Sequence, residues 1–180
     1  AIYCNDRSIG SGTYNTGSTD FDYGAKTRLN TNKTPSYKCG ANTSNGLFES
    51  TQAVADKFSA STEGGGNGQL KYPIALMTAD EVSFAGGLNW TDLSSPYAWY
   101  CTNSQGESIT GGQYWWSLSP YDWDGTYADA WGVHDSELGA SDVQRDGGVR
   151  PAISLSSCVN ISYGNGTPSY PYVIDESSCS

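Results

Sequence analysis

The sequence has few basic residues. Lys and Arg total 9 against 19 Asp and Glu, which gives a formal net charge of -10 over 180 residues. Residues 72–180 hold two basic and thirteen acidic residues, whereas residues 1–71 hold seven and six. An acidic surface repels nucleic-acid phosphates and anionic lipid headgroups. We therefore expect no nucleic-acid partner and no direct membrane binding, while cationic, neutral polar and sugar-like partners stay open.

Long apolar runs are also lacking. None approaches the roughly 20 residues of a membrane span, or the apolar core of a signal peptide. Because the sequence starts at Ala1, we expect a mature or trimmed chain, located outside the cell or on its surface. How such a chain would be anchored is left open.

The cysteines lack the close CxxC spacing of zinc sites, and disulfides in an oxidising compartment are the alternative. We expect Cys158 to pair with Cys179 and Cys4 with Cys39, because each bond would close a loop near one end of the chain. Cys101 is then left over. It is either buried, free or bonded to another chain.

Residues suited to catalysis are scarce, and we do not expect an enzyme. His134 is the single histidine, so any Ser, His and Asp triad would have to include it. With Asp135 beside it in an acidic segment, a surface position is the better interpretation. Asp122 and Asp124 could pair as in glycosidases, but nothing in the sequence marks either as a proton donor.

Aromatic residues and glycine are abundant, with 13 Tyr, 6 Trp and 22 Gly. One domain of 180 residues has room for a hydrophobic core, and we expect residues 1–180 to form a single unit with an N-terminal part up to residue 70. Residues 1–46 have the texture of short strands and loops. The predicted fold class is α+β, with few short helices, short antiparallel strands and long ordered loops.

Two helices are predicted. Residues 47–58 place apolar side chains at roughly helical spacing, and the glycine-rich run 61–68 follows as a flexible loop. A strand from Tyr72 should pass into a short helix that Thr78 caps, because Glu81 completes a capping box. Predicted strands lie at residues 98–101, 113–119, 127–133, 149–155 and 172–174.

The acidic, aromatic segment 121–146 is the predicted binding surface. Ala128, Ala130, Val133, Leu138 and Val143 should form its core-facing frame, with the larger side chains on the other face. Exposed Tyr and Trp are the usual anchors of recognition surfaces. The alternative is that Trp123 and Trp131 are core residues. The candidate ligand-binding residues are Tyr121, Asp122, Trp123, Asp124, Tyr127, Asp129, Trp131, His134, Asp135, Glu137, Ser141, Asp142, Gln144, Arg145 and Asp146.

Four stretches, taken in order, resemble a known group of proteins. They are YPIALMTADEVSFAGG at 72–87, YWWSLSP at 114–120, GVRPAISL at 148–155 and GNGTPSYPYVI at 164–174. Together they look like bacterial surface domains of the C-type lectin-like superfamily, and they are similar to the variable proteins of diversity-generating retroelements and their pilin-linked relatives. The match covers about residues 70–175.

The resemblance implies a C-type lectin-like fold and a ligand-binding or adhesion role toward a protein or glycan on another cell, phage or host. It also implies that a mutagenic reverse transcriptase diversifies adenines within codons 121–146, whereas Trp123 and Trp131 are not products of such mutation. The tripeptide of the superfamily's calcium-dependent sugar site is absent. We expect no cofactor, although Asp122, Asp124 and Asp129 could gather a calcium ion.

A second function remains open. The chain could be a structural subunit of a pilus or surface layer whose acidic segment is merely solvated and whose Cys101 links subunits. For Arg150 we expect a structural role, and Tyr114, Trp115 and Trp116 have the character of core residues.

Overall fold

The computed structural model describes residues 2–6, 8–36, 55–59, 68–69, 74–87, 114–134, 137–153, 155–165 and 169–179. In chain order the elements are β1 (Ile2–Asp6), β2 (Ile9–Gly12), β3 (Phe21–Tyr23), α1 (Gly24–Lys26), the π-helix η1 (Thr27–Asn32), β4 (Ala55–Ser59), β5 (Gly68–Gln69), β6 (Ile74–Leu76), α2 (Ala79–Phe84), β7 (Trp115–Trp123), β8 (Ala128–His134), β9 (Glu137–Asp142), β10 (Pro151–Ile153), β11 (Asn160–Tyr163) and β12 (Val173–Asp175). Short helices and mostly antiparallel strands define an α+β protein, as the composition predicted.

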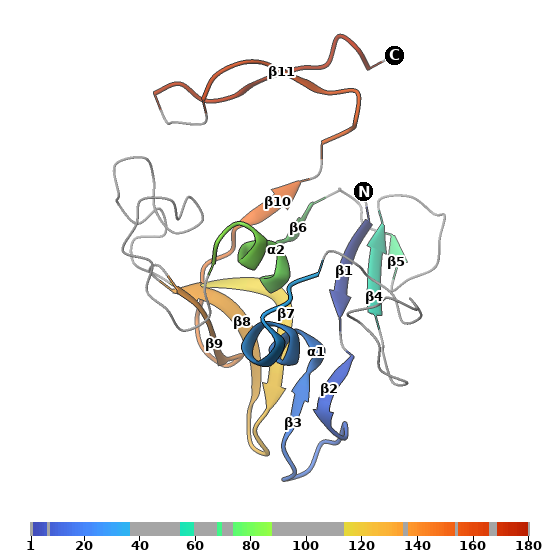
Figure 1. Cartoon of the computed structure of the whole chain (residues 1–180), viewed down its shortest axis with the longest axis vertical. Helices are drawn as coiled ribbons and strands as arrows, with labels where there is room; N and C mark the ends of the chain where they lie inside the picture. The colour runs from blue at the N-terminus through green and yellow to red at the C-terminus, as the bar shows by residue number, and fades with distance from the viewer. Residues whose placement is uncertain are drawn as a thin grey trace.

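The largest sheet has five strands in the order β2-β3-β7-β8-β9, and every pairing in it is antiparallel. Smaller sheets are formed by β1-β4-β5, by β10-β6 and by β11-β12. In Figure 1 the strands β7, β8 and β9 lie at the lower left, β1 and β4 lie at the right, and β11 runs across the top.

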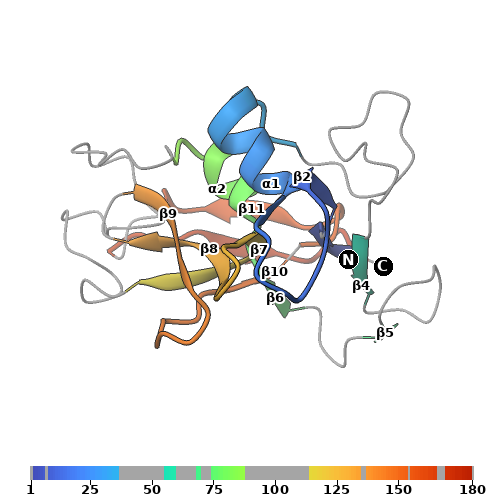
Figure 2. The same cartoon turned by 90° about the horizontal axis from the view of Figure 1, so that it is seen from below.

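The core lies between one face of the five-stranded sheet and the helices. Trp115, Trp131, Val133 and Leu138 are buried on the sheet, and Ala25, Leu29, Ala79 and Val82 of the helices complete the cluster. Figure 2 shows α1 and α2 on the same side of β7 and β8. The buried apolar side chains thus hold α1, η1 and α2 onto a single face of the sheet.

The predicted strand and capped helix at residues 72–87 are confirmed. β6 leads into α2, and the Thr78 side chain accepts a hydrogen bond from the Glu81 backbone N–H at 3.1 Å. In return, the Thr78 backbone N–H donates to the Glu81 carboxylate at 2.7 Å. Gly86 follows the helix with a positive φ of 103°, a conformation that favours glycine.

Two expectations about helices are wrong. No helix was expected within residues 1–46, yet α1 and η1 occupy residues 24–32. These helices contribute only Ala25 and Leu29 to the hydrophobic core, and two apolar residues are too few to show helical periodicity in the sequence. Residues 55–58, the end of the predicted helix 47–58, belong instead to β4, which pairs with β1. A distant strand supplied the backbone partners that helical spacing could not reveal.

Of the predicted strands, those at 113–119, 127–133, 149–155 and 172–174 correspond to β7, β8, β10 and β12. The strands β9 and β11 were not predicted. Gly68, the last residue of the predicted loop 61–68, starts β5. The predicted strand 98–101 lies outside the described residues, as do the rest of that loop and residues 47–54.

A buried ion cluster joins β1, η1 and α2. The Arg28 guanidinium donates to Asp80 at 3.0 and 2.8 Å and to Asp6 at 2.6 Å. All three side chains are almost fully buried. The backbone N–H groups of Ser8 and Ser36 donate to Asp6 and Asp80 respectively, so protein groups replace the lost water on both carboxylates.

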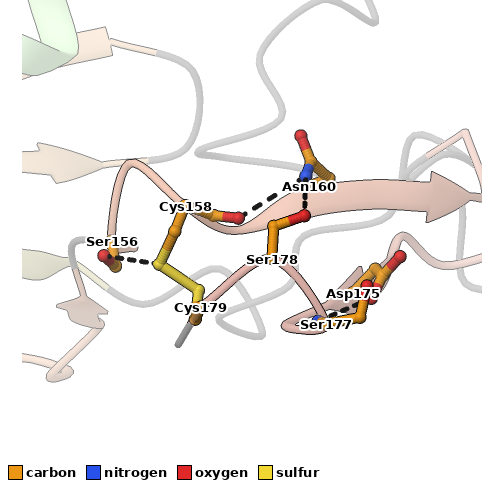
Figure 3. Close-up of a disulfide and its surroundings, with 7 residues drawn as sticks. All are labelled: Ser156, Cys158, Asn160, Asp175, Ser177, Ser178 and Cys179. Carbon is orange, nitrogen blue, oxygen red and sulfur yellow. Dashed lines mark hydrogen bonds between the residues drawn. A yellow bond between two sulfur atoms is a disulfide. The ribbon is translucent and has the colours of Figure 1, made fainter.

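The predicted disulfide between Cys158 and Cys179 is present, with a Cα–Cα distance of 5.1 Å (Figure 3). It closes the base of the β11-β12 pair. Cys39, Cys101 and the side chain of Cys4 lie outside what the structure describes. The pairing of Cys4 with Cys39 and the role of Cys101 therefore stay predictions.

The structural role expected for Arg150 has support, because its guanidinium lies 4.9 Å from the centre of the Trp115 ring. Trp115 is buried as expected, whereas Tyr114 and Trp116 are half-buried and lie edge to face, 4.7 Å apart. The Tyr114 hydroxyl donates to the carbonyl of Ala130 on β8.

Candidate functional site

Four aspartates lie side by side across one end of the five-stranded sheet. Asp22 on β3 is the register partner of Asp122 on β7, and Asp122 is the partner of Asp129 on β8. Asp129 in turn lies opposite Asp142 on β9. Directly opposite side chains in a sheet are about 5 Å apart at Cβ, so these four carboxylates are close neighbours. We call Asp22, Asp122, Asp129 and Asp142 the aspartate row.

One lysine neutralises half of the aspartate row. The Lys26 ammonium on α1 lies 2.7 Å from Asp22 and 2.6 Å from Asp122. It also lies 4.6 Å from the centre of the Tyr121 ring. Burial alone would lower the pKa of Lys26, but the hydrogen bonds to Asp122 and Asp22 raise it above its ordinary value. Lys26 therefore stays charged.

Among the described residues, the other half of the aspartate row has no ion-pair partner. No described residue forms an ion pair with Asp129 or Asp142. Partial burial raises the pKa of Asp129, and repulsion from Asp122, Asp124 and Asp142 raises it further, against a smaller lowering by Lys26. For Asp122, burial raises the pKa against the opposing effect of Lys26. Negative potential is thus concentrated at the β8-β9 side of the row.

A tight turn beside the aspartate row displays an aromatic ring. One Asp124 oxygen accepts the backbone N–H groups of Thr126 at 2.8 Å and Tyr127 at 2.6 Å, which lowers the pKa of Asp124. Gly125 has a φ of +85°, and a Cβ there would lie 2.8 Å from the Ser18 carbonyl oxygen. The turn holds Tyr127, whose side chain is exposed, as predicted.

The loop between β2 and β3 reaches the same end of the sheet. The Trp123 indole N–H donates to the Gly17 carbonyl at 2.7 Å, so this half-buried ring fastens the loop to β7. Tyr14 on that loop is exposed and packs against Phe21 at 5.4 Å between ring centres. Sequence reasoning did not find Asp22 or Lys26, because only the pairing of β3 with β7 and the contact of α1 with β7 place them beside Asp122. It also did not find Tyr14, whose loop is fastened to β7 through Trp123.

The prediction that Trp131 lies on the binding surface is wrong, and the alternative of a core position is right. Its side chain is 0% exposed and meets Tyr121 edge to face at 4.8 Å. The alternation correctly put Trp131 on the opposite face of β8 from Ala128 and Ala130. However, the helices cover the Trp131 face, and the two alanines are half-buried on the other side.

Of the other three residues predicted to face the core, two are buried and one is exposed. Val133 and Leu138 are fully buried, as predicted. Val143 is exposed, contrary to prediction, because β9 ends at Asp142 and Val143 begins the following turn.

The structure separates the remaining candidates into two groups. Gln144, Arg145 and Asp146 are exposed in the turn after β9, beside the aspartate row, and Ser141 is half-buried. His134 and Glu137 are register partners at the opposite end of the β8-β9 pair, five positions away. At about 3.4 Å per residue they lie roughly 17 Å from the row and do not belong to it. Asp135 lies outside the described residues.

Within the described ranges, no three His, Cys, Asp or Glu side chains are arranged to hold a metal ion. Of the candidate calcium ligands, Asp122 binds Lys26 and Asp124 closes the turn, while Asp129 lies opposite Asp122. The helices found in these ranges all lack the length and hydropathy needed to span a bilayer.

Comparison with known proteins adds no relative. No family model matches the chain, and no curated protein or solved structure matches it either. The structure defines an α+β protein with an acidic end to its five-stranded sheet. The C-type lectin-like fold remains an expectation from the resemblance.

Proposed function

We propose that this chain is a ligand-binding or adhesion module that acts outside the cell or at its surface, and that its contact face is the acidic end of the five-stranded sheet. The aspartate row is the observation that carries the proposal. Its ligand would be a protein or glycan that presents basic groups, since Asp129 and Asp142, which have no ion-pair partner among the described residues, attract positive charge.

The aspartate row lowers the stability of the fold, and this supports a role in binding. Like charges directly opposite each other in a sheet destabilise it, and Lys26 relieves only half of this row. Proteins retain such destabilising arrangements mainly where function requires them. A basic ligand that reached Asp129 and Asp142 would relieve the repulsion on binding.

The neighbouring turns provide the rest of a recognition surface. Tyr127 offers a large exposed ring with few rotatable bonds, and Tyr14 offers a second. Exposed Arg145 and its neighbours add polar contacts. Tyr127 and Arg145 fall in the segment 121–146 that the resemblance to variable proteins marks for diversification, while Tyr14 lies outside it and the buried Trp131 lies within it as scaffold.

The disulfide supports a location in an oxidising compartment. The Cys158–Cys179 disulfide is typical of secreted and surface proteins. We propose a C-type lectin-like scaffold as the fold, on the resemblance alone, and we propose no enzymatic activity and no resident cofactor.

The test uses the full chain on a printed array of basic peptides, aminosugar glycans and neutral glycans. We expect binding to at least one basic class, weakened about tenfold or more by Asp129→Asn and weakened by high salt. Asp129→Asn should not unfold the chain, because it removes a repulsion. Ile153→Ala, an exposed position on β10, is the control and should bind normally. Undiminished binding by Asp129→Asn would contradict the proposal, as would binding to no class.

The second candidate, a structural subunit of a pilus or surface layer, is favoured by a different observation. The C-terminal hairpin, which is the β11-β12 pair, exposes several apolar side chains. Burial against neighbouring subunits would cover them. In that case the array would show no binding, while the hairpin would mediate assembly.

A further inference from the structure

The C-terminal hairpin exposes a cluster of large apolar side chains to solvent. Ile161 and Tyr163 on β11 are 56% and 55% exposed, and Ile174 on β12 is 40% exposed. Tyr170 and Tyr172 between the strands are also exposed. Figure 1 shows the hairpin extending away from the rest of the fold. Clustered exposed apolar side chains mark an interaction surface.

The hairpin is also too small a sheet to be stable without support. Within the described residues it has two strands, and isolated two-stranded ribbons are at best marginally stable in water. The Cys158–Cys179 disulfide fastens its base, and Asn160 donates to Ser178 beside it at 3.3 Å (Figure 3). Ile161 lies opposite Ile174, but no described strand extends the sheet beyond them. Additional strands would complete it.

The two edges of the hairpin differ in their protection against pairing. The β12 edge ends in Asp175 and Glu176, and Pro171 precedes it. Charges and proline are the usual means by which proteins protect a sheet edge. The β11 edge is Asn160–Tyr163, with the sequence NISY, and residues 155–165 contain no Asp, Glu, Lys or Arg. Only a bulge between Ile161 and Tyr163 interrupts it. Strand β11 is therefore the edge open to a partner.

We propose that β11 pairs antiparallel with β11 of a second copy of this chain, about a twofold axis. The dimer would have a four-stranded sheet in the order β12-β11-β11-β12, with Ile161 and Ile174 of both copies available to one another. Self-pairing through β12 would instead bring the Asp175 carboxylates together. No partner of other chemistry is needed, because the β11 edge is uncharged and complements itself.

The charge distribution makes the β11 edge the place where two acidic copies repel each other least. Each chain has a net charge of -10, so two copies repel least where negative charge is sparse. The β11 edge lies at the top of Figure 1, and the β7-β8 turn of the acidic end lies at the bottom. Dimerisation leaves the aspartate row accessible and does not depend on the function proposed for it.

The test is sedimentation velocity of the full chain over a concentration series. We expect a reversible monomer–dimer equilibrium that strengthens with salt, because salt screens the repulsion between acidic copies. In Ile161→Lys, two ammonium groups would face each other near the axis, and the association constant should fall about tenfold or more. Ile153→Lys, at a more exposed isoleucine on β10, is the matched control and should associate as the unaltered chain does.

Hydrogen exchange of the unaltered chain gives a second measurement that does not depend on any variant folding. Amides of β11 should exchange more slowly as protein concentration rises, whereas those of the β7-β8 turn should not change. A chain that stays monomeric at every concentration would overturn the proposal. So would equal loss of association in both lysine variants, or concentration-dependent protection located outside the hairpin.

Discussion

Replacing Arg28 with Met tests the buried ion cluster that joins three elements of the fold. Arg28 is 3% exposed and binds both Asp6 and Asp80. Methionine keeps much of the length of the arginine stem, so packing changes little, while the guanidinium is lost. The substitution leaves two buried carboxylates facing each other with no cation between them.

The expected loss follows from that burial. Breaking a buried ion pair by removing one partner costs about 3–5 kcal/mol, because the remaining charge stays buried and unpaired. The backbone N–H groups of Ser8 and Ser36 still donate to the two carboxylates, which favours the middle of the range. A loss of about 4 kcal/mol is a large part of the 5–15 kcal/mol that holds a typical domain folded.

Urea unfolding followed by tryptophan fluorescence measures this loss, with Lys26→Met as the matched control. Lys26 carries the same charge two residues earlier and also bridges two aspartates, but its side chain is 23% exposed. We expect it to cost only about 1 kcal/mol. If Arg28→Met costs no more than Lys26→Met, the buried cluster does not stabilise the fold as argued.

Further variants test three other parts of the account. The folded state raises the pKa of Asp129, so its ionised carboxylate destabilises the fold. Solvent screens this half-buried group, so Asp129→Asn should add only about 0.5 kcal/mol at neutral pH, a gain that disappears below the unfolded pKa of about 4. No gain at neutral pH would contradict the repulsion. Trp131→Ala should cost about 3–5 kcal/mol and Trp123→Ala much less, in thermal melts; equal losses would contradict the core assignment. Replacing Cys158 and Cys179 with Ser should destabilise the C-terminal hairpin by about 3 kcal/mol for a loop of this length, measured by hydrogen exchange; unchanged exchange there would contradict its dependence on the disulfide.

Features encoded over a few residues could be predicted from the sequence. The capping box of Thr78 and Glu81 fixes the start of α2 by contacts three residues apart, and the prediction was accurate to the residue. The alternation along β8 also correctly separated Trp131 from Ala130. What alternation cannot provide is the face that the helices cover, so Ala128 and Ala130 were assigned to the core side that Trp131 occupies.

Features that depend on distant partners could not be predicted. The fold of residues 55–59 as β4 depends on β1, more than fifty positions earlier. In the aspartate row, Asp122, Asp129 and Asp142 were candidates because the segment is acidic, but Asp22 joins them only through the pairing of β3 with β7. The register of a sheet, not local sequence, assembles this site.

Sequencing of codons 114–150 across many cells that carry this locus tests the central claim most directly. A diversified binding face predicts adenine-directed, amino-acid-changing variation at exposed turn codons such as those of Asp124, Tyr127 and Arg145. The codons of Trp131 and Val133, which are buried in the core, should stay constant. No variation in this segment, or equal variation at the exposed and buried codons, would contradict the account.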